Sequence, residues 1–319
     1  MAIPERSGPR DDGNGKRVAL VLGAGGARGL AHIGAIETLQ RRGYTIAAIS
    51  GASMGALIGG IFAAGRLDAY RDWVCALERG DVIRLLDFAF GHPGLIKGEK
   101  VLNAVRELVG EHRIEELPIP YMAVATDLRR QREVWLTRGP LFDAIRASIA
   151  IPMILTPHRI SGRELVDGGL LAPVPIAGTR MAMVDLVVAV DVSAQVPRRR
   201  GARPLAAANS KVDPARESNP APAGLRAKVA AFIEGLMEKD PPADAERPSQ
   251  TGMLELVSRS LDTMQSRIAR LQLALDPPDV LVRVPHDVAY FYEFWRAREL
   301  IGIGARAADR ALDDYESGD

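Results

Sequence analysis

The sequence contains little cysteine, no long apolar run and no excess of either charge, and each shortage excludes a class of protein. Cys75 is the single cysteine, which excludes an internal disulfide framework and is typical of a reducing cytosol. No apolar run approaches the roughly eighteen residues of a transmembrane helix, so we expect no span. With 41 basic and 40 acidic residues the net charge is +1, so a nucleic-acid partner is not expected. Residues 1–16 are polar and lack the apolar core of a signal peptide, which predicts a disordered leader.

Apolar residues are plentiful, at 47% of the chain, and their arrangement predicts an α/β fold. Residues 18–22 form a β-like run that passes through glycines into a helix-like run from Leu30. Residues 46–50 and 56–65 repeat this pattern, and two such units predict a mainly parallel sheet flanked by helices. Ligands collect beyond the carboxyl ends of parallel strands, so both glycine-rich loops are expected to line one pocket.

The remaining elements divide the chain into a catalytic core, residues 17–194, an insertion, and a C-terminal part that completes the same domain. In the core we expect strands at 121–128, 133–139, 163–167 and 184–193, and a helix from Leu141 that is stopped by Pro152. Residues 195–250 are rich in proline, alanine and charge, which predicts a flexible insertion. Residues 251–315 are expected to form a long helix over 253–275, a strand over 279–285 and a terminal helix from about Tyr290.

The segment Gly51-Ala52-Ser53-Met54-Gly55 matches the G-x-S-x-G nucleophile elbow, in which a serine occupies a sharp turn between a strand and a helix. Side chains two residues to either side would collide with the neighbouring strand and helix, and glycine removes that collision. The helix start also offers backbone N–H groups to an oxyanion. The bland alternative is a tight turn built from small residues.

A serine nucleophile needs a base, and the sequence offers two kinds. The histidines are His32, His92, His112, His158 and His286. A structural role is favoured for His32, whereas His158 or the late His286 are candidates for completing a Ser-His-Asp triad. Asp167 is the better candidate, because it ends a short strand and is followed by Gly168 and Gly169, which allow close approach of other backbone. Its alternative is an ordinary Asp-Gly turn.

Three ordered segments together resemble the patatin-like phospholipase family, in particular its bacterial members: "GAGGARGLAHIGAIETL", "GASMG" and the later "DGG". "RASIAIPMILTP", between the elbow and Asp167, adds to the resemblance. The resemblance implies an α/β/α fold and a serine hydrolase that cleaves lipid esters with a Ser53 nucleophile and an Asp167 proton acceptor. It also implies an oxyanion hole at Gly25, Gly26 and Ala27, beside the basic Arg28. Ala24 replaces the first of three glycines usual in the family.

That resemblance implies no cofactor or metal, and a fatty-acyl ester as substrate, with cytoplasmic location and peripheral contact at the inner membrane surface. Residues 230–239, in the insertion, are a candidate interfacial helix or lid, with a solvated loop as the alternative. Leu86, Phe88, Phe90 and Leu95 are a candidate rim of the acyl pocket, with burial in the core as the alternative.

Two other functions compete with hydrolysis. The run "VLGAGGARG" follows a strand and opens a helix, but a strict G-x-G-x-x-G fails at Arg28, which disfavours dinucleotide binding. A regulatory or interaction protein that retains the fold with little activity is the other reading, and the intact Ser53 and Asp167 argue against it.

Overall fold

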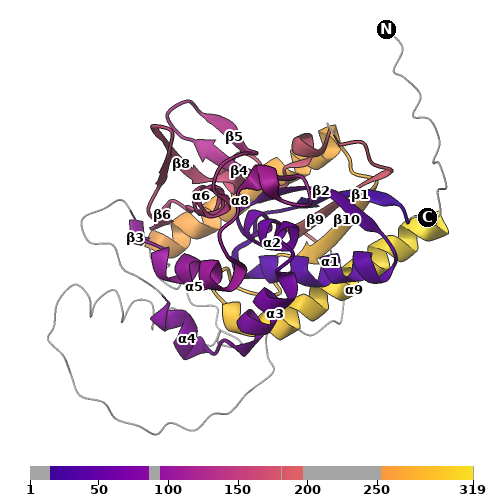
Figure 1. Ribbon diagram of the computed structural model, residues 1–319, viewed down its shortest axis with the longest axis horizontal. Helices are drawn as coiled ribbons and strands as arrows, with labels where there is room; N and C mark the ends of the chain where they lie inside the picture. The colour runs from indigo at the N-terminus through magenta and orange to yellow at the C-terminus, as the bar shows by residue number, and fades with distance from the viewer. Residues whose placement is uncertain (1–14, 86–93, 181, 197–252, 319) are drawn as a thin grey trace, which may run out of the picture.

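The computed structural model describes residues 15–85, 94–180, 182–196 and 253–318 (Figure 1). The predicted leader, except its last two residues, lies outside this described part, as do residues 197–250 of the insertion with their candidate interfacial helix. The suggested pocket rim at Leu86, Phe88 and Phe90 lies outside it too, and so does the side chain of Leu95. All helices and strands named for this fold lie within these described ranges.

One mixed sheet organises the fold, with strand order β10-β9-β1-β2-β4-β8-β7 and β5 paired to β4. Neighbouring strands from β10 to β4 are parallel, whereas β5 and β8 run antiparallel to β4 and β7 runs antiparallel to β8. The strands are β1 (Arg17–Leu22), β2 (Thr45–Ala52), β4 (Tyr121–Asp127), β5 (Arg132–Leu136), β7 (His158–Ile160), β8 (Arg163–Asp167), β9 (Leu186–Ala194) and β10 (Val280–Pro285). A second, two-stranded sheet pairs β3 (Gly94–Ile96) with β6 (Met153–Leu155). The prediction of a mainly parallel α/β sheet is confirmed.

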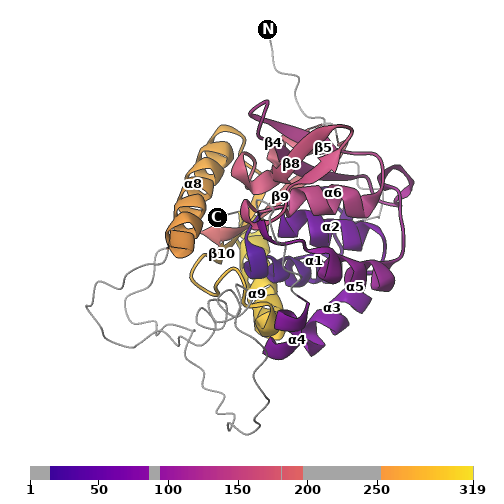
Figure 2. The same ribbon diagram turned by 90° about the vertical axis from the view of Figure 1, so that its left-hand side faces the viewer.

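Helices cover both faces of the sheet, and the strand residues alternate accordingly. Leu20 and Leu22 of β1 belong to the main core with the helices of one face, whereas Val21 packs on the opposite face with Ala269. Figure 2 shows the single long helix α8 (Met253–Leu275) on that opposite face. The other helices are α1 (Ala31–Arg41), α2 (Met54–Ala63), α3 (Leu67–Ala76), α4 (Arg79–Arg84), α5 (Glu99–Val109), α6 (Leu141–Ser148) and α9 (Ala297–Ser317). Short 3₁₀ turns are η1 (Gly26–Leu30), η2 (Ile114–Glu116), η3 (Gly168–Leu170), η4 (Ile176–Thr179) and η5 (Phe294–Arg296).

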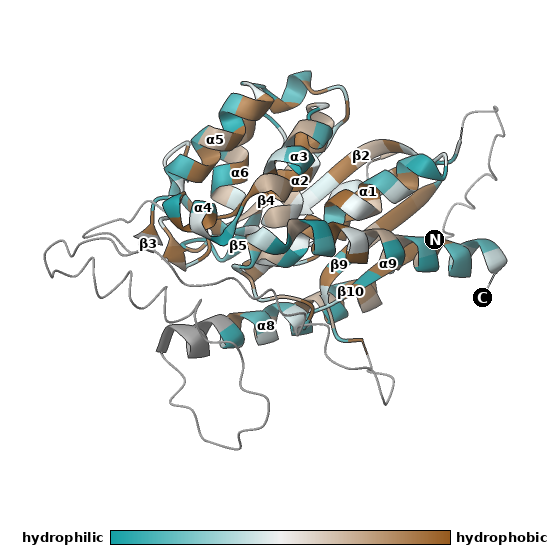
Figure 3. Cartoon of the chain, turned by 90° about the horizontal axis from the view of Figure 1, so that it is seen from below, coloured by the Kyte–Doolittle hydropathy of each residue, from teal (hydrophilic) through white to brown (hydrophobic). Residues whose placement is uncertain are grey.

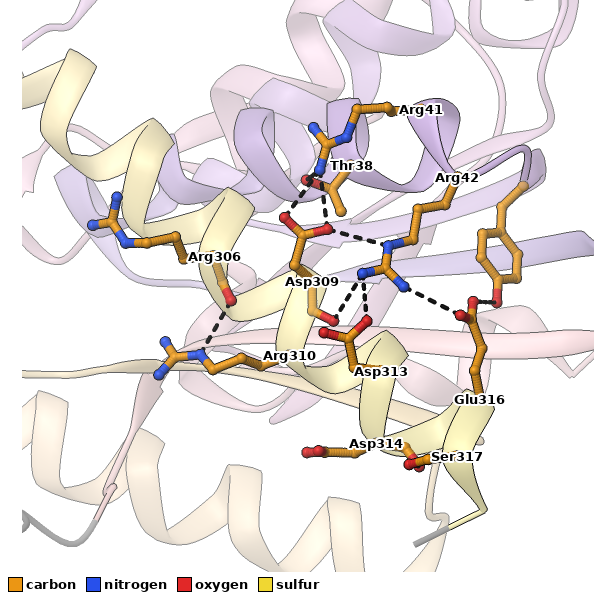
Figure 4. A network of polar contacts seen from close by, with 11 residues as sticks. Thr38, Arg41, Arg42, Arg306, Asp309, Arg310, Asp313, Asp314, Glu316 and Ser317 are labelled. Atoms are coloured by element: carbon orange, nitrogen blue, oxygen red, sulfur yellow. Dashed lines mark hydrogen bonds and ion pairs between the residues drawn. The ribbon is translucent and has the colours of Figure 1, made fainter.

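Helices α1 and α9 touch backbone to backbone through two glycines. A Cβ added to Gly34 would lie 2.0 Å from the Ile301 carbonyl oxygen, and one added to Gly304 would lie 1.9 Å from that of Ala31. Beyond this contact, arginines at the end of α1 bond to acids of α9: Arg41 and Arg42 share Asp309 (Figure 4). The contact ties the C-terminal helix to the first β-loop-α unit.

Two predicted helix boundaries are wrong. The terminal helix begins at Ala297 and not near Tyr290, because the Glu293 carboxylate accepts hydrogen bonds from the Tyr290 N–H and from Arg296 and holds a turn there. The helix from Leu141 ends at Ser148, four residues before Pro152. At this end the Ser148 hydroxyl accepts a hydrogen bond from the Ser53 N–H and donates one to the Val124 carbonyl.

Candidate active site

Ser53 occupies the turn between β2 and α2 in a conformation that L-residues rarely adopt. Its φ is 54° and its ψ is −122°, and only 3% of the residue is exposed. A Cβ on Gly51 would lie 2.5 Å from the Gly55 carbonyl oxygen, and one on Gly55 would lie 2.0 Å from that of Leu22 in β1. Both positions therefore require glycine, and the turn stores on the order of 1–3 kcal/mol of backbone strain at Ser53.

The edge of β4 brings Asp167 beside this turn. Val124 pairs with both β2 and β5, and Ala125 pairs with both β5 and β8, so β2 and β8 share one edge of β4. Along that edge Val124 is opposite Ala52 and Ala125 is opposite Asp167. The carboxyl end of β2, just before Ser53, and the carboxyl end of β8, at Asp167, therefore meet on this edge of β4 from opposite directions.

The two glycines after Asp167 are needed for close packing. A Cβ on Gly168 would lie 2.0 Å from the Val124 carbonyl oxygen. One on Gly169 would lie 2.7 Å from the methyl carbon of Ala24 in the first glycine-rich loop. The Gly169 N–H also donates to Asp167 Oδ1 at 2.7 Å. The turn after Asp167 is therefore packed tightly between β4 and the loop that follows β1.

Burial gives Asp167 an unusual protonation behaviour. The residue is 1% exposed, and desolvation raises its pKa to about 7, against smaller lowering effects of Ser53 and of the Gly169 N–H. The Ser53 side chain thus interacts with the carboxyl group, but Oδ2 accepts no well-formed hydrogen bond from the described residues. Near neutral pH this carboxyl group can both take up and release a proton.

Ser148, which the sequence patterns did not single out, contacts the backbone of the turn at Ser53. Its hydroxyl accepts from the Ser53 N–H at 2.9 Å and donates to the Val124 carbonyl at 2.6 Å. The residue is fully buried at the end of α6. The hydroxyl thus links the turn at Ser53 to β4 at the point where β2 ends. The available signal was the "RASIAIP" segment, which carried the family resemblance without indicating a role for its serine.

The glycine-rich loop after β1 also lies beside Ser53, and two of its backbone N–H groups have no acceptor among the described residues. Neither the Gly25 nor the Gly26 N–H donates to an acceptor within the described residues, and both residues line the cavity at Ser53. Ala27 differs, because its N–H donates to the Phe291 carbonyl at 2.8 Å. The expectation that Ala27 contributes a free oxyanion donor is therefore corrected, and the available pair is Gly25 and Gly26.

Arg28 ties this loop to distant parts of the chain. Its guanidinium donates to the carbonyl oxygens of Gly25 and His286, and reaches Asp262 of α8 at 3.4 Å. Arg28 is 5% exposed, so its charge is directed into these contacts. The side chain connects the glycine loop, the turn after β10 and the helix that crosses the site.

A small cavity of about 40 Å³ joins these groups, and α8 closes it on one side. Ser53, Asp167 and the Gly25-Gly26 loop contribute its polar wall together with Arg28, Asp262 and Gln265. The remainder is mainly apolar and consists of Ala24, Ile151, Pro152, Ile154, Leu170, Leu261 and Phe291. A fatty-acyl chain is far larger than this space.

The described histidines, His32, His112, His158 and His286, do not line this cavity. His32 is fully buried, its Nε2 donates to the Gly23 carbonyl at 2.8 Å, and burial lowers its pKa to about 4. His158 faces Asp143 on the surface side of α6, with Nε2 to Oδ1 at 3.4 Å, and His286 is exposed. The geometry places a carboxylate and no described imidazole beside Ser53.

Comparison with known proteins gives one family match and several relatives. Residues 20–179 match the family described as patatin-like phospholipase. An uncharacterized NTE family protein of Mycobacterium tuberculosis is 42% identical, with 95% of this chain and 93% of the relative covered. Lysophospholipase nte1 of Emericella nidulans is 31% identical over 56% of this chain and 12% of its own length. The solved structure of VipD from Legionella pneumophila covers 95% of this chain and 67% of that chain, with a TM-score of 0.43 and 14% identity.

A strained serine turn, a buried aspartate and a glycine-rich loop thus meet at one end of a mainly parallel sheet. The chain belongs to the patatin-like phospholipase family.

Proposed function

We propose that this protein hydrolyses carboxylic ester bonds of lipids, phospholipids included, through an acyl intermediate on Ser53 with Asp167 as the proton acceptor. The observation that carries the proposal is the meeting of Ser53, in its strained elbow, with the buried Asp167 in one cavity. Family membership and the relatives named as lysophospholipases support a lipid hydrolase in the broader sense.

In the proposed acylation step the Ser53 Oγ attacks the ester carbonyl carbon while its proton passes to Asp167. An ordinary aspartate, with a pKa near 4, is a weak base for this task. Burial raises the pKa of Asp167 to about 7, which brings it closer to the optimum for a general base at neutral pH. The carboxylate becomes protonated in the tetrahedral intermediate and returns that proton to the departing alcohol.

The Gly25 and Gly26 N–H groups are the proposed donors to the oxyanion. They line the cavity without an intramolecular acceptor among the described residues, so a substrate oxygen meets them without displacing a protein group. Loss of one such donor typically costs on the order of 3 kcal/mol of transition-state stabilisation. Arg28, through its bond to the Gly25 carbonyl, is proposed to hold the loop in position.

Water completes the cycle in the proposed deacylation step. Asp167, ionised again, takes a proton from the water, whose oxygen attacks the carbonyl carbon of the acyl group bound to Ser53 Oγ. The bond between that carbon and Oγ then breaks, and Asp167 returns the proton to Oγ. The products are a free fatty acid and the restored serine. Apolar residues beside Ser53, including Ile154 and Phe291, favour an acyl chain over a polar acyl group. We place this activity in the cytoplasm, with peripheral contact to the membrane that supplies the substrate.

Turnover of p-nitrophenyl acyl esters by the wild type, Ser53→Ala and Asp167→Asn tests the proposal. We expect both substitutions to abolish turnover, because one removes the nucleophile and the other its base. His158→Ala and His286→Ala serve as controls and should leave turnover largely intact. Wild-type rates in both site variants would refute the proposal, and a collapse in either histidine variant would replace the dyad with a triad.

A fluorophosphonate probe separates an active enzyme from an inert scaffold. The probe reacts with an activated serine whatever the preferred acyl group is, so it does not require the natural substrate. Labelling of the wild type and its loss in Ser53→Ala are the expected results. An unlabelled wild type would favour the regulatory reading.

A further inference from the structure

The outward face of α8 carries an apolar row that no described residue covers completely. The row consists of Leu261, Met264, Ile268, Leu271 and Leu275, which we call the outer stripe. The spacing of three and four residues places them on one side of the helix. Met264 is 60% exposed, Leu271 52% and Leu275 85%. Single exposed leucines are common, but a row on one helix face is not.

The opposite side of α8 is fixed to the protein body. Gln272 donates to the Leu171 carbonyl at 2.9 Å, and Ala269 is buried against the sheet. Asp262 bonds to Arg28, and Asp276, just beyond the helix end, bonds to Arg180. These contacts leave Met264, Leu271 and Leu275 of the outer stripe exposed, whereas Leu261 turns toward the Ser53 cavity. Figure 3 shows α8 at the edge of the molecule.

Two charged residues beside the outer stripe, Arg267 and Arg270, are both basic. Arg267 and Arg270 are both exposed, and neither pairs with a carboxylate among the described residues. The acids at positions 262 and 276 are each paired with an arginine, Asp262 with Arg28 and Asp276 with Arg180. An apolar row flanked by arginines without a carboxylate partner is the pattern of a helix that lies in a membrane interface and attracts anionic lipid.

The outer stripe also leads to the candidate active site. Leu261, its first residue, lines the Ser53 cavity, and Asp262 and Gln265 of the same helix form part of the cavity wall. Met153, 47% exposed, lies between the cavity residues Pro152 and Ile154. A surface seated on the outer stripe would therefore meet the chain close to the cavity that the substrate has to enter.

We propose that the outer stripe of α8, with Arg267 and Arg270, is the surface on which this protein docks to an anionic lipid bilayer. The inference names a partner for the proposed lipid hydrolase and rests on that function. A symmetric pairing of two copies through this face would bring Arg267 and Arg270 of both copies together, which repels. Residues 197–252 hold ten basic and seven acidic residues, so as a whole they carry no excess of the negative charge that would complement the arginines.

Vesicle co-sedimentation of the full-length Ser53→Ala chain tests the docking without turnover. We expect binding to vesicles of phosphatidylcholine with one third phosphatidylglycerol, and much weaker binding to phosphatidylcholine alone. Arg267→Gln and Arg270→Gln should each weaken binding to the anionic vesicles about fivefold. Leu271→Gln with Leu275→Gln should weaken it at least tenfold. Met183→Gln and the pair Arg306→Gln with Arg310→Gln are matched exposed controls, and wild-type affinity is expected for them.

A fluorophore at position 271 identifies what covers the stripe. Leu271→Cys in a Cys75→Ser background, labelled with an environment-sensitive dye, should shift its emission to the blue only when anionic vesicles are added. A blue-shifted dye without vesicles at all protein concentrations would assign the stripe to another part of the chain. A shift that grows with protein concentration would assign it to a second copy. Either result overturns the inference.

Hydrolysis of a water-soluble short-chain ester separates this inference from the proposed function. The stripe variants, in a chain with Ser53 intact, should hydrolyse that ester at the wild-type rate, because the substituted residues lie outside the Ser53 cavity. Unchanged vesicle binding in these variants would overturn the docking surface and leave the hydrolase intact. Absent ester hydrolysis in the wild type would overturn the hydrolase itself.

Discussion

Ser53 directly follows β2 and Asp167 ends β8, and these two strands pair with consecutive residues of β4, β2 in the parallel and β8 in the antiparallel direction. Ala52, just before Ser53, is opposite Val124, and Asp167 is opposite Ala125. The separation of Ser53 from the buried carboxyl group is therefore set by the sheet and not by a flexible loop. A site built on rigid strands keeps its geometry better than one built on loops.

The pKa of Asp167 predicts how activity depends on pH. The carboxyl group accepts the serine proton only when ionised, and its pKa is raised to about 7. We expect kcat/KM for a soluble ester to rise tenfold per pH unit below about pH 6 and to level off above about pH 8. A rate that is independent of pH from 5 to 8 would contradict a buried aspartate base.

The same shift predicts that Asp167 lowers the stability of the fold at neutral pH. In the unfolded chain the aspartate ionises with its ordinary pKa of 3.8, whereas in the folded protein its pKa is about 7, so the free energy of unfolding falls as the pH rises through this window. The full cost is about 4 kcal/mol above pH 7. Asp167→Asn should therefore be inactive and, at pH 8, more stable by up to that amount.

Urea unfolding at pH 8 and pH 5 checks this stability prediction. The gain of Asp167→Asn over the wild type should shrink by about 2–3 kcal/mol at pH 5, because that pH lies only a little above the pKa of the unfolded aspartate. The titration of His32 affects both proteins equally and cancels. An equal gain at both pH values would exclude the titration of Asp167 as its cause.

Ser148 is predicted to position the nucleophile. Ser148→Ala removes the acceptor of the Ser53 N–H and the donor to Val124, so the elbow loses its link to β4. We expect kcat to fall about 10- to 100-fold with little change in KM, since a small displacement of the reacting atom is enough. Ser148→Thr, which keeps the hydroxyl, should recover part of kcat.

Ser50→Ala is the matched control for this prediction. Ser50 is also buried and donates to a carbonyl oxygen, that of Pro175, at 2.8 Å, but does not contact the elbow N–H. Both alanine variants should lose about 1–3 kcal/mol of stability. An equal fall of kcat in both would show that Ser148 acts only through general stability.

The contact between α1 and α9 predicts a sharp difference between two glycines of α9. Gly304→Val places side-chain atoms against the Ala31 carbonyl, which leaves no room, and should destabilise the protein by about 3 kcal/mol or more. Gly302→Ala, whose Cβ meets only the flexible end of Arg306 at 3.3 Å, should be neutral or stabilising. Chemical unfolding measures both, and similar losses would contradict the packing described.

Local chemistry in the sequence by itself determined the β-loop-α units, the serine elbow and the glycine-rich loop. Their requirements are short-range: Gly51 and Gly55 are needed because atoms within a few residues, or on the adjacent strand, leave no space. The sequence pattern also ranked Asp167 above the histidines, since a carboxylate before two glycines suits a strand end.

Only the tertiary structure decided which groups meet Ser53. The antiparallel return of β8 along β4, the bridging hydroxyl of Ser148 and the use of the Ala27 N–H by Phe291 all join residues far apart in the chain. The same holds for α8, whose place over the cavity follows from bonds to Arg28 and Leu171. Such contacts depend on how the helices and strands pack, and no local pattern of residue types specifies that packing.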